Sequence, residues 1–123
     1  MTAGVSNPSS FGTINIIVIS SKTLSEGAIA GTIITATEAK TRALIDKGLQ
    51  FTGTTSDAIV VAYEGTGEGE PILYSGPATP FGRRVAKLVR AGVKEALKAH
   101  YGSDDVNKRQ LSFHDRWSKH NSL

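Results

Sequence analysis

Two runs of β-branched residues enclose one long segment with helical periodicity, and this order limits the folds that the chain can adopt. Residues 13–20 and 57–63 are mostly apolar and lie next to glycine, serine and threonine, as buried strands do. Between them, residues 24–47 repeat apolar side chains at helical spacing, with Gly48 just past the end. The 123 residues are enough for one compact domain with its own core.

A third strand and a second helix are predicted after residue 63. Residues 71–75 are a short apolar run behind a glycine-rich turn, which predicts a β-hairpin over residues 57–75. Thr79 and Pro80 are a typical cap and first residue of a helix. Gly82 and Gly92 lie on or near the apolar stripe of this helix, which predicts close backbone packing against the sheet.

The element order β-α-β-β-α predicts an α+β fold, with two main helices packed on one face of a small, mostly antiparallel sheet. We assign residues 1–102 to this single domain. Residues 103–123 are predicted to form a polar C-terminal tail, either loosely held or docked by a short helix that carries Phe113 and Trp117. No targeting sequence is visible and the apolar runs are too short to span a bilayer, so we expect a cytoplasmic protein without membrane association.

Composition excludes several kinds of chemistry. The chain has no cysteine, so neither disulfides nor thiolate catalysis is available. Its three histidines, at positions 100, 114 and 120, fall at or after the end of the second helix, which argues against a metal site inside the fold. The glycine-rich turn joins two predicted strands, whereas a dinucleotide-binding loop leads from a strand into a helix. We therefore expect neither a metal ion nor a cofactor.

Basic residues form a stripe on the second helix, and they are Arg83, Lys87, Arg90, Lys94 and Lys98. Such a stripe could bind phosphates or an acidic partner, although it is more often the solvated face of a helix. No aromatic residues interleave with it, so nucleic-acid binding is not expected.

The first helix carries reactive side chains on a face that otherwise belongs to the core. Thr23 and Glu26 match a T-x-x-E capping box at its start. Lys40 falls among apolar residues, so its ammonium must reach the surface, pair with a carboxylate or line a polar cleft. Glu38 lies at the margin of the same face. A helix whose polar residues simply reach solvent is the alternative.

Seven short stretches along the chain resemble the CbiZ-type adenosylcobinamide amidohydrolases, in the same order and at similar spacing. They are Thr2-Ala-Gly-Val-Ser-Asn7, Gly12-Thr-Ile-Asn-Ile-Ile-Val18, Thr35-Ala-Thr-Glu-Ala-Lys-Thr41, Thr52-Gly-Thr54, Ser56-Asp-Ala-Ile-Val-Val-Ala62, Gly76 and Phe81-Gly82. The resemblance implies hydrolysis of the amide that links the aminopropanol arm to the corrin ring. Adenosylcobyric acid, the product, would re-enter cobalamin synthesis during archaeal salvage.

The chain also departs from the family pattern. It resembles the C-terminal part of the family, and the N-terminal half has no counterpart before Thr2. Residues 52–57 read T-G-T-T-S-D where the family has T-G-T-G-T-D, and residues 76–79 lack a histidine that the family often carries. The chain is therefore expected to be a fragment, a subunit that works with a second chain, or a reduced homologue. A homo-oligomer, or a second chain that supplies the missing half, is the expected assembly.

Amide hydrolysis needs an activated water or nucleophile, a group that stabilises the oxyanion and a proton for the leaving amine. Glu38 is our candidate acid or base, because partial burial would raise its pKa. Lys40 could stabilise the oxyanion, and Asp57 could orient Lys40 or act as a second carboxylate. The predicted substrate-binding residues are Asn15, Thr37, Thr41, Gly53, Thr54, Thr55 and Ser56. This hypothesis requires Glu38, Lys40 and the loop at residues 52–57 to share one pocket.

Each of these residues also has a structural explanation. Asp57 could be a turn residue that binds its own backbone, and Asn15 a hydrogen-bonded amide in a strand. Thr2, exposed by methionine removal, is an alternative nucleophile. At the level of function, the alternatives to an amidohydrolase are a non-catalytic corrinoid-binding or assembly module, and an interaction protein that uses the basic stripe to bind an acidic partner.

Overall fold

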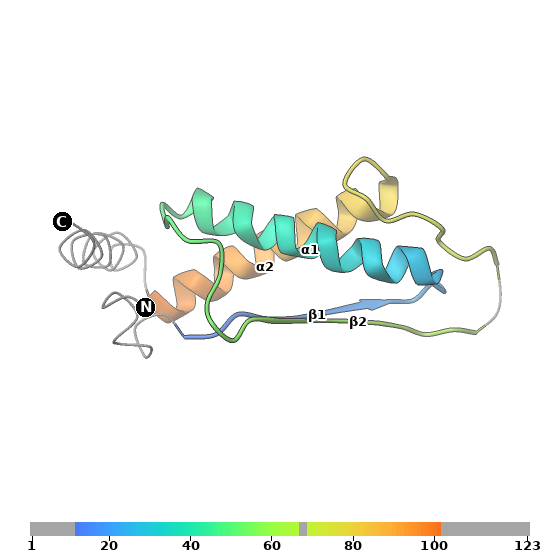
Figure 1. Cartoon of the computed structure of the whole chain (residues 1–123), viewed down its shortest axis with the longest axis horizontal. Coiled ribbons are helices and arrows are strands. Elements are labelled where there is room, and N and C mark those ends of the chain that lie inside the picture. The colour runs from blue at the N-terminus through green and yellow to red at the C-terminus, as the bar shows by residue number, and fades with distance from the viewer. Residues whose placement is uncertain (1–11, 67–68, 102–123) are drawn as a thin grey trace, which may run out of the picture.

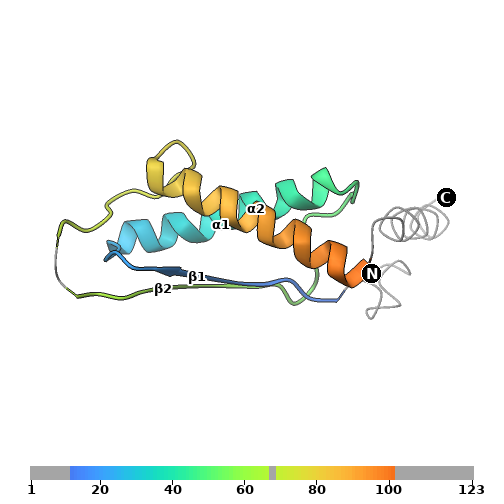
Figure 2. The ribbon, with the colours of Figure 1, turned by 180° about the vertical axis from the view of Figure 1, so that it is seen from behind.

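The described part of the protein has two layers, with two helices over one face of a two-stranded sheet (Figure 1). A computed structural model describes residues 12–66 and 69–101. The elements in chain order are β1 (Asn15–Ser20), α1 (Glu26–Asp46), β2 (Ala58–Tyr63) and α2 (Pro80–Tyr101). Seen from behind, α2 lies in front of α1 (Figure 2). The α+β class agrees with the sequence prediction. The predicted tail at residues 103–123 and Thr2 lie outside the described residues.

The sheet is parallel, so the prediction of a mostly antiparallel sheet is wrong. β1 pairs with β2 in a register that runs from Asn15 opposite Ala58 to Ser20 opposite Tyr63. Helix α1 forms the crossover between the two strands, and such a crossover returns the chain to the end where β1 began. The strand sequences, NIIVIS and AIVVAY, are near-continuous apolar runs, which is typical of strands in parallel sheets.

The predicted β-hairpin over residues 57–75 is also wrong. In the described residues, the segment after β2 makes one isolated parallel bridge, between Ile72 and Leu24. The Ile72 N–H donates to the Thr23 carbonyl and the Ser25 N–H donates to the Ile72 carbonyl, both at 2.9 Å. Residues 71–75 therefore run beside the start of α1 instead of pairing with β2. Pro71 has no N–H to donate, which disfavours a continuous ladder.

The ends of α1 are set by Ser25 and Gly48. The Ser25 Oγ accepts a hydrogen bond from the Ala28 N–H at 3.0 Å, so Ser25 is the cap in place of the predicted Thr23. The backbone of Thr23 is instead used in the bridge to Ile72. Gly48 has φ of 79°, a left-handed conformation that favours glycine, as predicted for the residue just past the helix.

Helix α2 starts as predicted, because the Thr79 Oγ1 accepts a hydrogen bond from the Gly82 N–H at 3.0 Å. The predicted packing of Gly82 and Gly92 is wrong. A Cβ on Gly82 would come within 1.9 Å of the Gly76 carbonyl oxygen, so its close neighbour is the loop at residues 75–76 and not the sheet. A Cβ on Gly92 would meet nothing within 4 Å.

The core lies between the helices and the side of the sheet that they cover. Its buried apolar residues are Ala36, Ala39, Ala43, Leu44, Leu49, Val85, Val89, Val93, Leu97 and Tyr101, with Ile14, Ile16, Val18 and Ile59 partly buried against them. The other face of the sheet is open, and Ile17, Ile19 and Val60 are 68%, 69% and 53% exposed there. No helix among the described residues is long and apolar enough to cross a membrane.

Candidate functional site

Lys40 and Asp57 form a largely buried ion pair. Lys40 Nζ lies 2.8 Å from Asp57 Oδ2, and the two side chains are 9% and 11% exposed. The helical period places Lys40 on the inner face of α1, where an unpaired ammonium would be costly. Asp57, which directly precedes β2, provides the opposite charge. The sequence prediction that Lys40 needs a carboxylate or a polar cleft is therefore met by this pair.

The Asp57 carboxylate also binds the backbone of two other segments. It accepts hydrogen bonds from the Thr54 N–H at 2.9 Å and from the Ile14 N–H at 3.0 Å, and it accepts a further bond from the Thr54 hydroxyl. Burial raises the pKa of Asp57, but the hydrogen bonds from Lys40, Thr54 and Ile14 outweigh it and lower the pKa to about 2. Asp57 is thus ionised at neutral pH and is a weak base.

Glycine at position 53 allows this pair to form. A Cβ there would lie 2.5 Å from Asp57 Oδ2 and 2.7 Å from Lys40 Nζ. Next to Ile14 and Asp57 in the chain, Thr13 Oγ1 and Ser56 Oγ are exposed and 2.5 Å apart, and Thr55 is also exposed. The structure therefore brings Lys40, Asp57 and the hydroxyl-rich loop together, as the sequence analysis required.

Glu38 lies elsewhere, and the predicted single pocket is not formed by the described residues. Two positions along a helix differ by about 200°, so Glu38 and Lys40 point to different sides of α1. Glu38 is exposed and lines a groove of about 640 Å³ between α1 and α2, together with Arg42, Lys87 and Arg90. The partial burial expected for Glu38 is absent. Its carboxylate makes no hydrogen bond or ion pair within the described part of the chain.

The remaining predicted binding residues divide into two groups. The Thr37 and Thr41 hydroxyls donate to the carbonyls of Ile33 and Thr37, at 2.7 and 3.1 Å, so both are satisfied within α1. Asn15 is exposed at the start of β1 and lines a second groove, between β1 and α2. Within the part of the chain that the structure describes, none of these three forms a hydrogen bond or ion pair with Lys40 or Asp57.

Sequence reasoning missed a buried hydroxyl cluster that connects α1 to the loop before α2. Thr35 Oγ1 donates to the Ser75 carbonyl at 2.8 Å, and Ser75 Oγ donates to the Ala28 carbonyl at 2.6 Å. A Cβ on Gly31 would lie 2.6 Å from Ser75 Oγ. The available signal was helical spacing, because Ala28, Gly31 and Thr35 lie on one side of α1.

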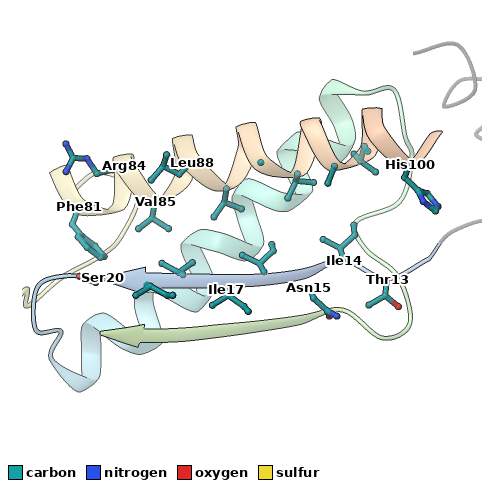
Figure 3. Close-up of a pocket in the computed structure, with 18 of the residues that line it drawn as sticks. Thr13, Ile14, Asn15, Ile17, Ser20, Phe81, Arg84, Val85, Leu88 and His100 are labelled. Carbon is teal, nitrogen blue, oxygen red and sulfur yellow. The ribbon is translucent and has the colours of Figure 1, made fainter. Parts of the chain in front are cut away.

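The second groove, of about 800 Å³, was also missed. It runs along the whole of β1 beneath α2. Figure 3 shows Phe81 and Val85 pointing from α2 toward β1, with Ser20 at one end and Thr13 and His100 at the other. The available signal was a second row on α2, spaced four residues apart, that contains Leu88, Gly92 and Ala96.

The basic stripe is partly neutralised. Asp46, at the end of α1, accepts contacts from Arg90 Nε at 2.5 Å, Lys94 Nζ at 2.8 Å and Arg42 Nε at 3.4 Å. Hydrogen bonds from Arg90 and Lys94 lower the pKa of Asp46 to about 2. Across residues 12–66 and 69–101, no three His, Cys, Asp or Glu side chains are grouped so that they could hold a metal ion.

Comparison with known proteins identifies the family. The model of the CbiZ family, described as adenosylcobinamide amidohydrolase, matches residues 1–105. The chain belongs to this family. It is 48% identical over 109 residues to an adenosylcobinamide amidohydrolase of Methanosarcina mazei, a match that covers 80% of this chain and 54% of the relative. An adenosylcobinamide amidohydrolase of Halobacterium salinarum is 36% identical over 122 residues, covering 85% of this chain and 50% of the relative.

An uncharacterized protein of Methanocaldococcus jannaschii is 45% identical over 94 residues, covering 70% of this chain and 36% of that protein. The chain thus spans about half the length of the two amidohydrolases that it matches. No solved structure matches it.

Four of the seven CbiZ-like stretches meet at one place among the described residues. Ile14, Lys40, Thr54 and Asp57 come from four different stretches and are joined by the hydrogen bonds of the Asp57 carboxylate. Because β1 and β2 are parallel, both enter the sheet at this end of the molecule. Four of these stretches therefore contribute to the charged pair and to the loop that it holds.

Proposed function

We propose that this chain takes part in the hydrolysis of the aminopropanol amide of adenosylcobinamide, which yields adenosylcobyric acid. Its membership of the CbiZ family, over residues 1–105, is the observation that carries this proposal. The 48% identity to an adenosylcobinamide amidohydrolase supports the same reaction. The activity belongs to relatives about twice as long, so a second stretch of polypeptide is proposed to complete the protein. Self-association, a cytoplasmic location and a place in archaeal salvage stay predictions.

Within this chain, Lys40 and Asp57 are proposed as a positioning pair. Asp57 is already engaged by Lys40, Thr54 and Ile14, and its pKa of about 2 makes it a poor proton acceptor at neutral pH. Its carboxylate fixes the loop at residues 53–56 against the start of β1. The exposed hydroxyls of Thr13, Thr55 and Ser56 are then available to the polar side chains of a corrinoid.

Glu38 stays our proposed proton-transfer residue. It is exposed, and it has no hydrogen-bond or ion-pair partner among the described residues, so a substrate can reach its carboxylate. Cationic side chains line the same groove, and an oxyanion formed there could be stabilised by Lys87 or Arg42. This proposal replaces the single shared pocket of the sequence analysis, because Glu38 lines the groove between α1 and α2 and the Lys40–Asp57 pair does not.

One observation favours the corrinoid-binding module as a second candidate. The Lys40–Asp57 site combines exposed hydroxyls with a charged pair whose members already satisfy each other, so it offers polar contacts to a ligand but no free acid or base. The interaction protein is less well supported, because Arg90 and Lys94 of the basic stripe are paired with Asp46.

The test is to incubate the chain with adenosylcobinamide, by itself and together with the part of the Methanosarcina mazei enzyme that lies outside the match, and to measure released aminopropanol. Release in either sample supports the amidohydrolase. Corrinoid binding with no release in both samples supports the module. Retention on a polyanion resin that Arg90→Ala and Lys94→Ala abolish, with no corrinoid binding, would support the interaction protein and contradict both corrinoid functions.

A further inference from the structure

One edge of β1 is unpaired. Hydrogen bonds at the two ends of the sheet show which residues of β1 face β2. The Ala58 N–H donates to the Ile14 carbonyl at 3.3 Å, and the Glu64 N–H donates to the Ser20 carbonyl at 2.9 Å. Even-numbered residues of β1 therefore direct their backbone groups at β2. By alternation, the N–H and C=O groups of Asn15, Ile17 and Ile19 face the opposite edge. Within residues 12–66 and 69–101, none of these groups has a hydrogen-bond partner.

Helix α2 overhangs this free edge. The groove beneath it is lined by all six residues of β1 and by Leu88, Gly92 and Ala96 of α2 (Figure 3). Leu88 is 65% exposed, and a Cβ on Gly92 would meet no atom within 4 Å. A strand of six residues is about 20 Å long, so a groove along the whole of β1 has the length of a strand. Gly92 and Ala96 of α2 are small, so they leave room in the groove for the backbone of another strand.

The sheet is incomplete in a second respect. Its strands are apolar on both faces, yet Ile17, Ile19 and Val60 are more than half exposed on the face that no helix covers. Parallel sheets are normally covered on both faces, and a sheet of two strands has little stability of its own. The open face indicates a missing covering layer, and the free edge with only two strands indicates that a further strand belongs beside β1.

We propose that a β-strand from the part of the CbiZ family polypeptide that these 123 residues do not span adds to the free edge of β1 beneath α2. The proposal rests on family membership and on the proposed completion by a second stretch of polypeptide, and not on the amidohydrolase reaction. The two amidohydrolase relatives are about twice as long as the matched region, so they contain enough residues. The incoming strand would bond to Asn15, Ile17 and Ile19 and place apolar side chains under Leu88.

The experiment uses the full 123-residue chain and, as probe, the part of the Methanosarcina mazei amidohydrolase outside the 109 matched residues, produced as a separate polypeptide. Binding is measured by calorimetry for the unchanged chain, Leu88→Glu and Ile45→Glu. Ile45 is a matched control, because it is 55% exposed on α1 and does not line the groove. Both variants should keep the circular dichroism of the unchanged chain, since both side chains are already exposed.

We expect the probe to bind, and Leu88→Glu to weaken binding at least about tenfold, because its carboxylate would be buried without a partner. Ile45→Glu should stay within about twofold. In the complex, hydrogen exchange at the Ile17 and Ile19 amides should slow. Absence of binding, equal loss in the two variants, or binding that leaves those amides unprotected would each overturn the proposal. Aminopropanol release is a separate readout, so failure of the amidohydrolase reaction would be recognised independently.

Discussion

At the scale of single residues, the charged groups of α1 have different tasks. Lys40 is buried and paired, whereas Glu38 is exposed and has no partner in the described segments. The sequence analysis placed Lys40 within one apolar face and Glu38 at the margin of that face, because spacing along a helix shows direction only within broad limits. It correctly required a partner for the Lys40 ammonium, since burial of an unpaired charge is costly. The loop conformation that brings Asp57 and Gly53 to Lys40 leaves no comparable pattern in the sequence.

Replacement of Asp57 by asparagine should destabilise the fold at neutral pH by roughly 2 kcal/mol, because the pKa of Asp57 is lowered from 3.8 to about 2 in the folded chain. A lowered pKa stabilises the folded state above pH 3.8, and this contribution is lost as the pH falls toward 2. Urea unfolding between pH 2 and 7 measures it. The unchanged chain should lose stability across that window, and Asp57→Asn should lose less. Parallel pH profiles for the two proteins would contradict the role of the pair.

Replacement of Glu38 by glutamine should abolish turnover without altering the fold, if Glu38 transfers the proton. The substitution keeps the size of the side chain and removes only the ionisable group. The test measures the rate of aminopropanol release. The thermal unfolding midpoint is measured in parallel and should not change. Glu95→Gln, on the exposed surface of α2, is the control. Full activity of Glu38→Gln would remove Glu38 from the mechanism.

At the scale of elements, the helices were easier to predict than the sheet. Thr79, Pro80 and Gly48 mark helix ends by local chemistry, and the structure has them at those ends. Strand direction depends on contacts between residues far apart in the chain, and the run at residues 71–75 looked like a strand because it is apolar. Its actual contacts, with Thr23 and Ser25, are to the start of α1 and could not be inferred from periodicity.

Two glycines of α2 should respond in opposite ways to alanine. Gly82→Ala should destabilise the fold by roughly 3 kcal/mol, because the new Cβ would overlap the backbone of Ser75 and Gly76. Gly92→Ala should stabilise the chain by about 0.5–1 kcal/mol, because its Cβ would meet open space and alanine favours the helix. Thermal unfolding of both variants measures the contrast. A destabilised Gly92→Ala chain would show that the groove beneath α2 is already filled.

The ion pairs of Asp46 connect the end of α1 to α2, and their effect should depend on salt. Asp46→Asn should lower the thermal midpoint at low ionic strength, and the difference from the unchanged chain should shrink as salt is added. The pKa of Asp46 is lowered from 3.8 to about 2, so the same difference should also fall as the pH drops through that interval. A deficit that stays constant in high salt would argue against an electrostatic connection.

At the scale of the whole molecule, the described residues form two layers, one of helices and one of sheet. The helices cover one face of the sheet, and the other face and the outer edge of β1 remain open. The sequence identified the family from short stretches, and the family match covers most of the chain. What it could not show is which surface lacks its neighbour, because exposed apolar residues such as Ile17 and Leu88 look the same as core residues in a sequence.

Amide hydrogen exchange in the chain alone, followed residue by residue by NMR, tests this account most directly. The Ile16 and Val18 amides should exchange slowly, because their backbone groups face β2. The Ile17 and Ile19 amides should exchange almost as fast as in an unstructured chain, because they face the open edge. Slow exchange at all four positions would mean that another segment of this chain, or a second copy of it, already pairs with β1, and it would contradict the account.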